Sequence, residues 1–570
     1  MADTDFFQSP PELSNSYSSD QWLRLFLKWQ MPREILANIE PDLENFGRRA
    51  VEDILQWGRQ AEAQPPVHRP FDAWGHRVDE IEVSLAWQQL HRVSAEEGLI
   101  AIGYERRQQE HSRLYQFAKL HMFHPSSAFY SCPLAMADGA ARILEKHRGH
   151  PVADRAFAHL TSRDPQQFWT SGQWMTEKTG GSDVSGTLTS ARPLGGDRYA
   201  LSGVKWFSSS TTSEMALGLA RIEGAAEGSR GLSLFYIPVR LEGGGLNGIR
   251  VERLKDKMGT KALPTAELRL QDTQAHLLGQ EGQGVKSIAT MLNITRLYNS
   301  VSSTGQMRRA LALVESYSEK RKAFGRRLID HVLHRETLAG EKLNYLRSLL
   351  LTLNLAHLLG KEEVGVASLS DQLLLRALTP VTKLYTAKRA VSVVSEMLEC
   401  FGGAGYVEDT HIPVLLRDAQ VFSIWEGATN VLSLDLIRVL GKADAAKELL
   451  QSLAQRLKEL ESQAQGQGGA THGFSELVNT LNCEFMALEN FILSATQEGE
   501  EFVQASARSL AFSLAEIYSS LLFLEMMHWG ERAEPNFPWM SYGRRLVVRG
   551  LCQVICPGPE HRADSQNIVS

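Results

Sequence analysis

The sequence predicts a mainly α-helical protein with a β domain in its middle, which is the α+β class. Apolar residues recur at helical spacing up to about residue 165. From about Trp169 to Leu278 the period shortens to two, and glycine-rich turns separate the apolar segments. Helical spacing then returns and continues to the end of the chain. We therefore expect a helical domain at 1–165, a β domain at 166–280, a four-helix bundle at 281–440 and a helical extension at 441–570.

Composition and charge limit the class of protein. The chain has 570 residues, of which 43% are apolar and 22% are charged, and this excludes a disordered or collagen-like chain. Its 60 basic and 66 acidic residues give a net charge of −6, so we expect no general attraction to nucleic acid or anionic membranes. We expect no membrane-spanning helix, because such a helix needs a continuous apolar segment of about 18 residues.

The cysteine content and the two ends of the sequence indicate in which cellular compartment we expect the protein. Five scattered cysteines are too few for a disulfide framework and indicate a reducing environment. Cys552, Cys556 and His561 lie close in sequence but lack a fourth ligand, so we expect half-buried thiols and no metal. The acidic N-terminus has no signal or transit peptide features, and the last residues are not a peroxisomal signal. We therefore expect a cytoplasmic protein, with a mitochondrial location left open.

Local patterns define the elements in order. Asp20 precedes QWLRLFLKW, which places a helix cap before an apolar face at helical spacing. Glycine-rich turns divide the β domain into roughly six to eight strands. Short connections typical of an antiparallel bundle separate four long helices, which we expect at about 283–318, 335–360, 369–400 and 426–441. A Gly- and Gln-rich segment at 462–473 predicts a flexible loop within the extension.

Two glycine-rich segments fail the tests for nucleotide-binding motifs. In GQEGQGVKS (279–287), Val285 separates the second glycine from the lysine that a P-loop needs directly after it. FGGAGY (401–406) follows a predicted helix, whereas a dinucleotide fingerprint follows a strand. The chain has no H-E-x-x-H and no G-x-S-x-G, so metalloprotease and hydrolase functions have no local support.

The segment GQWMTEKTGGSDVSGTLTSA (172–191) opens the β domain and is the first candidate site. Gly180 and Gly181 allow the backbone to approach a ligand closely, and Thr176 and Ser182 supply hydroxyl groups. Successive backbone N–H groups in such a turn form an anion-binding nest. An ordinary polar loop has the same composition, so both interpretations stay open.

Two further segments combine polar and aromatic residues. In GVKWFSSS (203–210), Trp206 and Phe207 precede three serines, a pattern that suits a planar ring with a polar edge but also a core strand that ends in a turn. In SIWEGATN (423–430), Glu426 precedes a predicted helix, where an acid ordinarily complements the helix dipole. Crowding by Trp425 and other apolar neighbours would instead raise the pKa of Glu426 and suit a general base.

Together, these segments resemble the acyl-CoA dehydrogenase flavoprotein family. The matching motifs are M-T-E-x-x-G-G-S-D, the lysine and aromatic pair at a strand end, R-K-A-F-G (321–325), F-G-G-A-G-Y and R-D-A followed by E-G. The resemblance covers about residues 60–440 and is greatest to the AidB-like branch. It implies the family fold, which is an N-terminal helical domain, a middle β-barrel and a C-terminal four-helix bundle, here with an extra helical extension.

The resemblance implies FAD as the cofactor. Phe207 stands where many relatives carry tryptophan, and Arg321 would reach the FAD pyrophosphate of a neighbouring subunit, so a homodimer or homotetramer is implied. The positions that match cofactor-binding residues of the family are Gln173, Trp174, Met175, Thr176, Gly180, Gly181, Ser182, Trp206, Phe207, Ser208, Arg321, Phe324, Glu399, Gly402, Gly403, Ala428, Thr429 and Asn430.

The resemblance also implies the reaction, which is α,β-dehydrogenation of an acyl-CoA thioester with Glu426 as the base and hydride transfer to flavin N5. One branch of the family keeps its base at the position of Thr295, which cannot serve, and this favours Glu426. The positions that match substrate-binding residues are Ser182, Asn293, Arg296 and Gly427.

Four positions depart from the family pattern. Glu399 replaces a glutamine, and Ala428 replaces a threonine that contacts the flavin. Val332 replaces a glutamine that meets FAD, and Asn293 replaces an aspartate that helps to hold CoA substrates in straight-chain relatives. We expect FAD binding to survive these changes, whereas they put efficient acyl-CoA turnover in doubt.

Three functions therefore stay open. The first is an FAD-dependent dehydrogenase of acyl-CoA, with an electron-transfer flavoprotein as an acceptor. The second is a flavoprotein that binds acyl-CoA or fatty acid without efficient turnover. The third is DNA binding by an AidB-like flavoprotein, which the acidic extension disfavours because only Arg544, Arg545 and Arg549 form a basic cluster there. The extension also fits an oligomer interface or a membrane dock, and its apolar segment 519–527 fits a buried helix.

Overall fold

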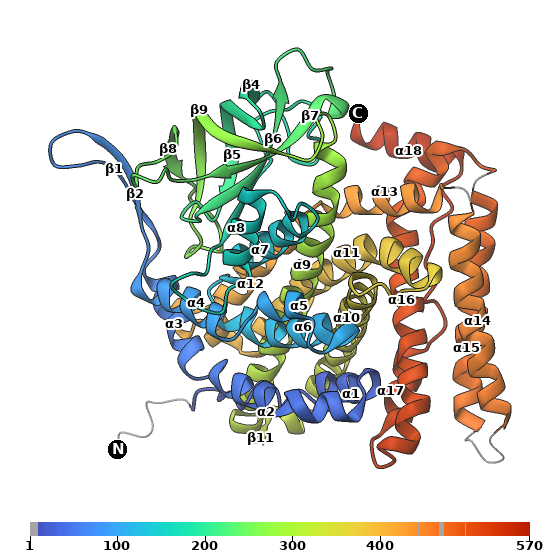
Figure 1. Cartoon of the computed structure of the whole chain (residues 1–570). Helices are drawn as coiled ribbons and strands as arrows, with labels where there is room; N and C mark the ends of the chain where they lie inside the picture. Colours follow the sequence, from blue (N-terminus) through green and yellow to red (C-terminus); the bar gives the residue numbers. More distant parts are fainter. Residues whose placement is uncertain (1–8, 443, 467–471, 496) are drawn as a thin grey trace, which may run out of the picture. The chain divides into compact units, whose positions relative to one another are not determined.

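The computed structural model describes residues 9–442, 444–466, 472–495 and 497–570. Contacts divide the chain into two compact units. Unit 1 comprises Met1–Glu44, Gln108–Ala118 and Asn299–Ser570, and unit 2 comprises Asn45–Arg107 and Lys119–Tyr298. Three helices that Figure 1 labels, α2 (Arg33–Arg49), α6 (Ser112–Phe123) and α9 (Gly284–Lys320), have residues in both units by this division.

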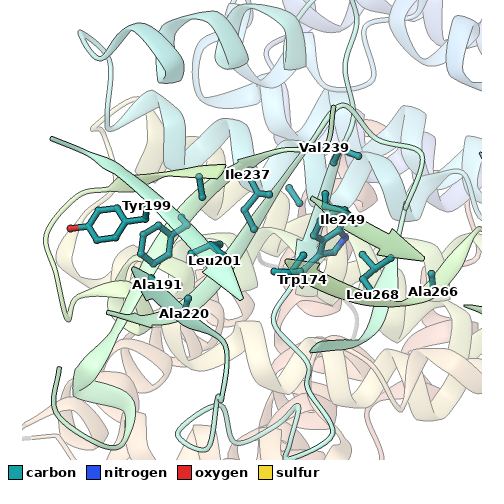
Figure 2. Packing of buried hydrophobic residues seen from close by; sticks show 14 of the residues in the cluster. Trp174, Ala191, Tyr199, Leu201, Ala220, Ile237, Val239, Ile249, Ala266 and Leu268 are labelled. Atoms are coloured by element: carbon teal, nitrogen blue, oxygen red, sulfur yellow. The ribbon is translucent and has the colours of Figure 1, made fainter. Parts of the chain in front are cut away.

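Unit 2 is built around a β-barrel. Hydrogen bonds join β6, β4, β5, β9 and β7 in that order and return from β7 to β6, which closes the ring, while β3 pairs with β6 and β8 pairs with β9. The seven strands confirm the predicted number and are β3 (Ser171–Trp174), β4 (Ser190–Gly195), β5 (Arg198–Ser209), β6 (Met215–Ile222), β7 (Leu232–Pro238), β8 (Ile249–Leu254) and β9 (Thr265–Leu278). Figure 2 shows Trp174, Leu201, Ile237 and Leu268 among the buried side chains of its core.

The helical part of unit 2 contains a hairpin that the sequence analysis did not predict. Strands β1 (Val67–Phe71) and β2 (Arg77–Glu82) pair antiparallel within the region expected to be entirely helical. Asp79 accepts a hydrogen bond from the Val251 backbone N–H at 3.1 Å, and Arg77 donates to the Val251 carbonyl at 2.7 Å. The hairpin is therefore held by Val251 on β8, and the spacing of residues within the hairpin segment does not predict this contact. The other helices of this unit are α3 (Asp53–Ala63), α4 (Leu85–Glu96), α5 (Ala101–Glu105), α7 (Ser131–Glu145) and α8 (Pro151–Leu160).

Unit 1 contains three of the predicted bundle helices and the C-terminal part of the fourth, α9. Asp20 caps α1 (Gln21–Gln30) by accepting a hydrogen bond from the Leu23 backbone N–H at 3.2 Å, as predicted. The last bundle helix begins at Thr429 and not at residue 426, because Gly427 has a positive φ of 103° and lies in a turn. The remaining elements up to residue 440 are β10 (Lys322–Ala323), β11 (Arg326–Arg327), α10 (Val332–Glu363), α11 (Leu369–Cys400), α12 (Pro413–Phe422) and α13 (Thr429–Leu440).

The extension consists of further helices of unit 1. They are α14 (Ala445–Gly466), α15 (His472–Ala495), α16 (Glu500–Ala533), α17 (Trp539–Leu546) and α18 (Pro559–Val569). Of the predicted loop at 462–473, residues 467–471 lie outside the described residues, and the rest belongs to α14 and α15, so the loop prediction was wrong at both ends. Within the described chain, α16 alone is long and apolar enough to cross a membrane, but 83% of its most apolar window is buried inside the fold, as in a core helix.

A buried polar network joins the extension to the bundle. The Arg347 guanidinium on α10 lies 2.8 Å from the Glu516 carboxylate on α16, and it also donates to the hydroxyl groups of Ser519 and Ser520. On α11, the hydroxyl of Tyr385 donates to the same carboxylate at 2.6 Å. Glu516 on α16 therefore connects three helices, because Arg347 belongs to α10 and Tyr385 belongs to α11.

We predict that Glu516→Ala lowers the free energy of unfolding by about 3–5 kcal/mol, because it leaves the Arg347 cation buried without its counter-ion. Urea denaturation followed by circular dichroism measures the change. The control is Glu52→Ala, which removes an ion pair to Arg48 whose two side chains are each 54% exposed, and it should cost less than about 1 kcal/mol. Equal effects of the two substitutions would contradict the prediction.

Candidate functional site

In unit 2, the predicted cofactor turn is tightly closed. The backbone N–H groups of Glu177 and Gly180 each donate to the other residue's carbonyl, at 3.1 and 3.2 Å. A Cβ on Gly180 would lie 2.4 Å from the Asp183 carbonyl oxygen, and one on Gly181 would lie 3.1 Å from the Thr176 side chain. Crowding against the backbone therefore requires a glycine at position 180, whereas a side chain at position 181 would press on the Thr176 side chain. Gly181 and Ser182 are exposed and Thr176 is half-buried.

A buried ion pair holds this turn to the strand that carries the aromatic residues. The Lys205 ammonium on β5 lies 2.7 Å from the Glu177 carboxylate, and the two side chains are 1% and 4% exposed. Burial by itself would raise the pKa of Glu177, but Lys205 and the donors of Thr189 and Leu188 outweigh it, so this pKa lies below its ordinary value. The Trp206 backbone N–H also donates to the Thr176 carbonyl at 2.9 Å. Two segments that are separate in sequence thus form one rigid unit.

The two adjacent aromatic residues have different surroundings. The Lys255 ammonium lies 3.6 Å from the centre of the Trp206 ring, and that of Lys178 lies 4.8 Å from it, which are cation–π contacts. The Phe207 side chain is 42% exposed. Of the pair, Phe207 therefore offers the more open ring surface to a planar ligand.

Several predicted cofactor residues on β3 and β5 face inward. Trp174 is 1% exposed and belongs to the barrel core in Figure 2, so its indole is a packing element, and Met175 is 8% exposed. The buried Gln173 Oε1, Trp174 Nε1 and Ser208 Oγ have no hydrogen-bond partner within the described chain. Buried polar atoms are ordinarily satisfied, so these atoms are suited to a polar ligand. The residues of this unit therefore fit a cofactor with a polar-edged ring.

Other predicted cofactor residues belong to unit 1 and lie on its surface. Phe324 is 97% exposed in the short β10–β11 hairpin, and Arg321 precedes that hairpin with an exposed side chain. The Tyr317 and Phe401 rings, 4.8 Å apart, connect the end of α9 to the F-G-G segment. Three further positions, Glu399, Gly402 and Gly403, are also exposed. This hairpin and the glycine-rich segment therefore form one exposed surface of unit 1.

Glu426 lies in the turn between α12 and α13. It is half-buried and has a φ of +56°, which is uncommon for a residue other than glycine, asparagine or aspartate. Backbone strain of this kind clusters at functional sites. Ala428 is the N-cap of α13 without a capping side chain, Thr429 is buried and Asn430 is exposed. Glu426 therefore precedes the helix in a strained turn, as the sequence indicated, although the helix was expected from about residue 426 and begins at Thr429.

The predicted substrate residues Asn293 and Arg296 lie on α9 within unit 2, where Asn293 is exposed and Arg296 is half-buried. Thr295 between them is 2% exposed. Val332 begins α10 in unit 1 and is 68% exposed. Two of the departures from the family pattern that concern ligand contacts, Asn293 and Val332, are therefore surface positions, whereas a third, Ala428, is half-buried.

Sequence reasoning missed the roles of Glu177 and Lys205. Glu177 lies in the segment 172–191 and Lys205 in the segment 203–210, but a pairing between them depends on the path of the chain and has no fixed spacing. A charged residue inside an otherwise apolar alternating strand was the only available signal, because a buried lysine ordinarily has a partner.

We predict that Lys205→Met lowers the free energy of unfolding by about 3–5 kcal/mol, since it leaves a buried carboxylate without its cation. Adding Glu177→Gln to the same chain should recover part of the loss, because the uncompensated charge is gone. Urea denaturation of the single and double variants measures both effects. Arg192→Met, which removes an exposed pair with Asp272, is the control and should cost less than about 1 kcal/mol.

Models of known families match consecutive parts of the chain. The adaptive response protein AidB N-terminal domain matches residues 8–164, and the acyl-CoA dehydrogenase middle domain matches 172–273. The acyl-CoA dehydrogenase C-terminal domain matches 282–441, and the acyl-CoA dehydrogenase 11 C-terminal domain-like model matches 445–554.

Individual relatives agree with these matches. Acyl-CoA dehydrogenase family member 11 of Caenorhabditis elegans is 44% identical over 529 residues, which cover 91% of this chain and 85% of the relative. AidB of Escherichia coli is 33% identical over 70% of this chain and 73% of its own length. The crystal structure of C. elegans ACDH-11 in complex with C11-CoA has a TM-score of 0.94 at 40% identity, covering 99% of this chain and 97% of that one. The chain therefore belongs to the acyl-CoA dehydrogenase family.

Proposed function

We propose that this protein is an FAD-dependent dehydrogenase of acyl-CoA thioesters and that Glu426 is its catalytic base. The observation that carries the base assignment is the turn between α12 and α13, which presents a half-buried carboxylate with a φ of +56°. The acyl-CoA class is supported by the C. elegans relative, whose crystal structure contains C11-CoA. A straight acyl chain of medium length is therefore the first substrate to test.

Each residue has a defined task in this proposal. Glu426 accepts the α proton of the thioester, and the electrons of that C–H bond form the new double bond as the β hydrogen leaves as hydride. FAD, when bound, supplies the acceptor for this hydride. Phe207 packs against the flavin ring, while Thr176, Ser182 and the unsatisfied atoms of Gln173 and Ser208 bind its polar edge. Arg296 and Ser182 bind the substrate side.

We also propose that the exposed surface of unit 1 around Arg321 binds the FAD pyrophosphate of a neighbouring subunit in a homo-oligomer. The Arg321 side chain is exposed, and the apolar residues around it in sequence, Phe324 at 97% and Leu333 at 80%, are unusually open for their type. A guanidinium binds phosphate bidentately, so arginine is suited to this position.

The base assignment predicts the outcome of an anaerobic flavin titration. Adding saturated acyl-CoAs, beginning with C11-CoA, should bleach the oxidised flavin band of the wild-type protein. Glu426→Gln should bind the same ligands but reduce the flavin about 10²–10⁴-fold more slowly, because it lacks the group that accepts the proton. The control is Glu408→Gln, a surface carboxylate paired with Arg417, which should react at the wild-type rate. Ligand binding without bleaching at any chain length would favour the second candidate, a binding protein without turnover, for which the substitutions at Asn293 and Val332 argue.

The subunit-bridging role of Arg321 predicts weaker cofactor retention in Arg321→Met. Loss of a hydrogen bond to a charged group costs about 1.5–3 kcal/mol, so the dissociation constant of FAD should rise roughly 10- to 100-fold. Fluorescence of released flavin measures this change, and light scattering measures the oligomeric state. Arg327→Met on the same hairpin is the control, because Asp330 already pairs with that guanidinium. An unchanged FAD affinity in Arg321→Met would refute the role.

A further inference from the structure

A buried lysine on α11 contacts the turn that carries Glu426. Lys383 is fully buried, and its ammonium donates to two backbone carbonyls, those of Trp425 and Gly427, at 2.7 Å each. These carbonyls belong to the residues immediately before and after Glu426. One cation therefore fixes the peptide groups on both sides of the proposed base, and all of these residues belong to unit 1.

The backbone between the two carbonyls is not in a relaxed conformation. Glu426 has a φ of +56° and Gly427 has a φ of +103°. A side chain at a positive φ is disfavoured by contact between its Cβ and the backbone, so the surrounding structure must hold it there. Both carbonyls accept from a single ammonium, and the backbone torsions of Glu426 and Gly427 lie along the chain between these two carbonyls. The contacts of Lys383 thus restrict the backbone angles that aim the Glu426 side chain.

Ordinary capping of a helix end does not account for the choice of lysine. Neutral amides already hold the two ends of α12, since Gln306 donates to the Leu415 carbonyl at 2.9 Å and Asn299 donates to the Phe422 carbonyl at 3.2 Å. Burying an ammonium costs more desolvation free energy than burying an amide. An ammonium, however, carries three donors on one compact atom, so it can reach two carbonyls that converge from different directions.

We propose that Lys383 is a positioning residue for the dehydrogenation reaction, which holds the turn so that the Glu426 carboxylate keeps its reactive orientation. This inference rests on the proposed function, because it requires Glu426 to be the base. Lys383 acts through the backbone carbonyls of Trp425 and Gly427 and accepts no proton in the reaction. A displacement of about 1 Å at a reacting group lowers a rate by about 10²-fold, so loss of this contact should affect chemistry far more than ligand binding.

The test compares holoproteins in anaerobic stopped-flow reduction by saturated straight-chain acyl-CoAs of short, medium and long chain. Lys383→Met removes the ammonium that donates to both carbonyls, and Lys383→Gln retains a neutral amide on a shorter side chain. We expect the limiting rate of flavin reduction to fall by about 10²-fold in Lys383→Met and by less in Lys383→Gln. The dissociation constant of the acyl-CoA should change less than about three-fold in either variant, because neither removes a ligand contact.

Gln306→Leu is the matched control, since it removes a buried donor to a backbone carbonyl at the other end of α12. It should lower the melting temperature, as the lysine variants do, but leave the reduction rate close to that of the wild type. A purely structural role for Lys383 predicts that all three variants show the same relation between melting temperature and rate. If Lys383→Met does not yield folded holoprotein, Lys383→Gln decides the question with the same two measurements.

Glu426→Gln in the same series separates this inference from the proposed function. A wild-type rate in Glu426→Gln, or a wild-type protein that binds every acyl-CoA without reduction, overturns the base assignment and the role of Lys383 with it. A slow Glu426→Gln combined with a wild-type rate in either folded lysine variant overturns the role of Lys383 alone. A slow rate with unchanged acyl-CoA affinity in the lysine variants supports it.

Discussion

A buried ammonium satisfies backbone or carboxylate acceptors at an irregular turn in each of the two units, and the candidate site residues depend on these two contacts. In unit 2, Lys205 pairs with Glu177 and donates to the Leu219 carbonyl at 2.9 Å, which holds the predicted cofactor turn against the barrel. In unit 1, Lys383 holds the turn of Glu426. Turns lack the regular hydrogen bonds of helices and strands, so buried ones need donors from side chains. A lysine suits this need because its donors radiate from one point.

The extension is continuous with the core of unit 1. Its helix α16 is buried along most of its length, and Glu516 at its centre pairs with Arg347 of the bundle. A second, half-buried pair between Arg456 on α14 and Glu525 on α16 connects two helices within the extension. Ion pairs of this kind add little net stability compared with apolar contacts, but they penalise any register in which one partner is left alone. They therefore fix how the extension helices pack onto the bundle.

The aromatic residues of the predicted cofactor motifs differ in their surroundings, so they cannot all have the same role. The ammonium groups of Lys255 and Lys178 lie 3.6 and 4.8 Å from the centre of the Trp206 ring, whereas Lys255 lies 5.9 Å from the centre of the Phe207 ring, whose side chain is 42% exposed. Trp174 also matches a cofactor position of the family, yet its indole lies in the barrel core. Neighbouring positions on a strand point to opposite faces, so residues adjacent in a motif need not share a ligand.

The sequence by itself determined the order of helical and β regions, the long helices of the bundle, the cap at Asp20 and the motifs that mark the family, because these depend on spacing within one segment. It did not determine the β1–β2 hairpin, whose partner Val251 lies far along the chain. Nor did it determine the pairing of Lys205 with Glu177 or the contact of Lys383 with the Glu426 turn. Only the tertiary structure decided these features, because each one joins residues whose separation in sequence follows no periodic rule.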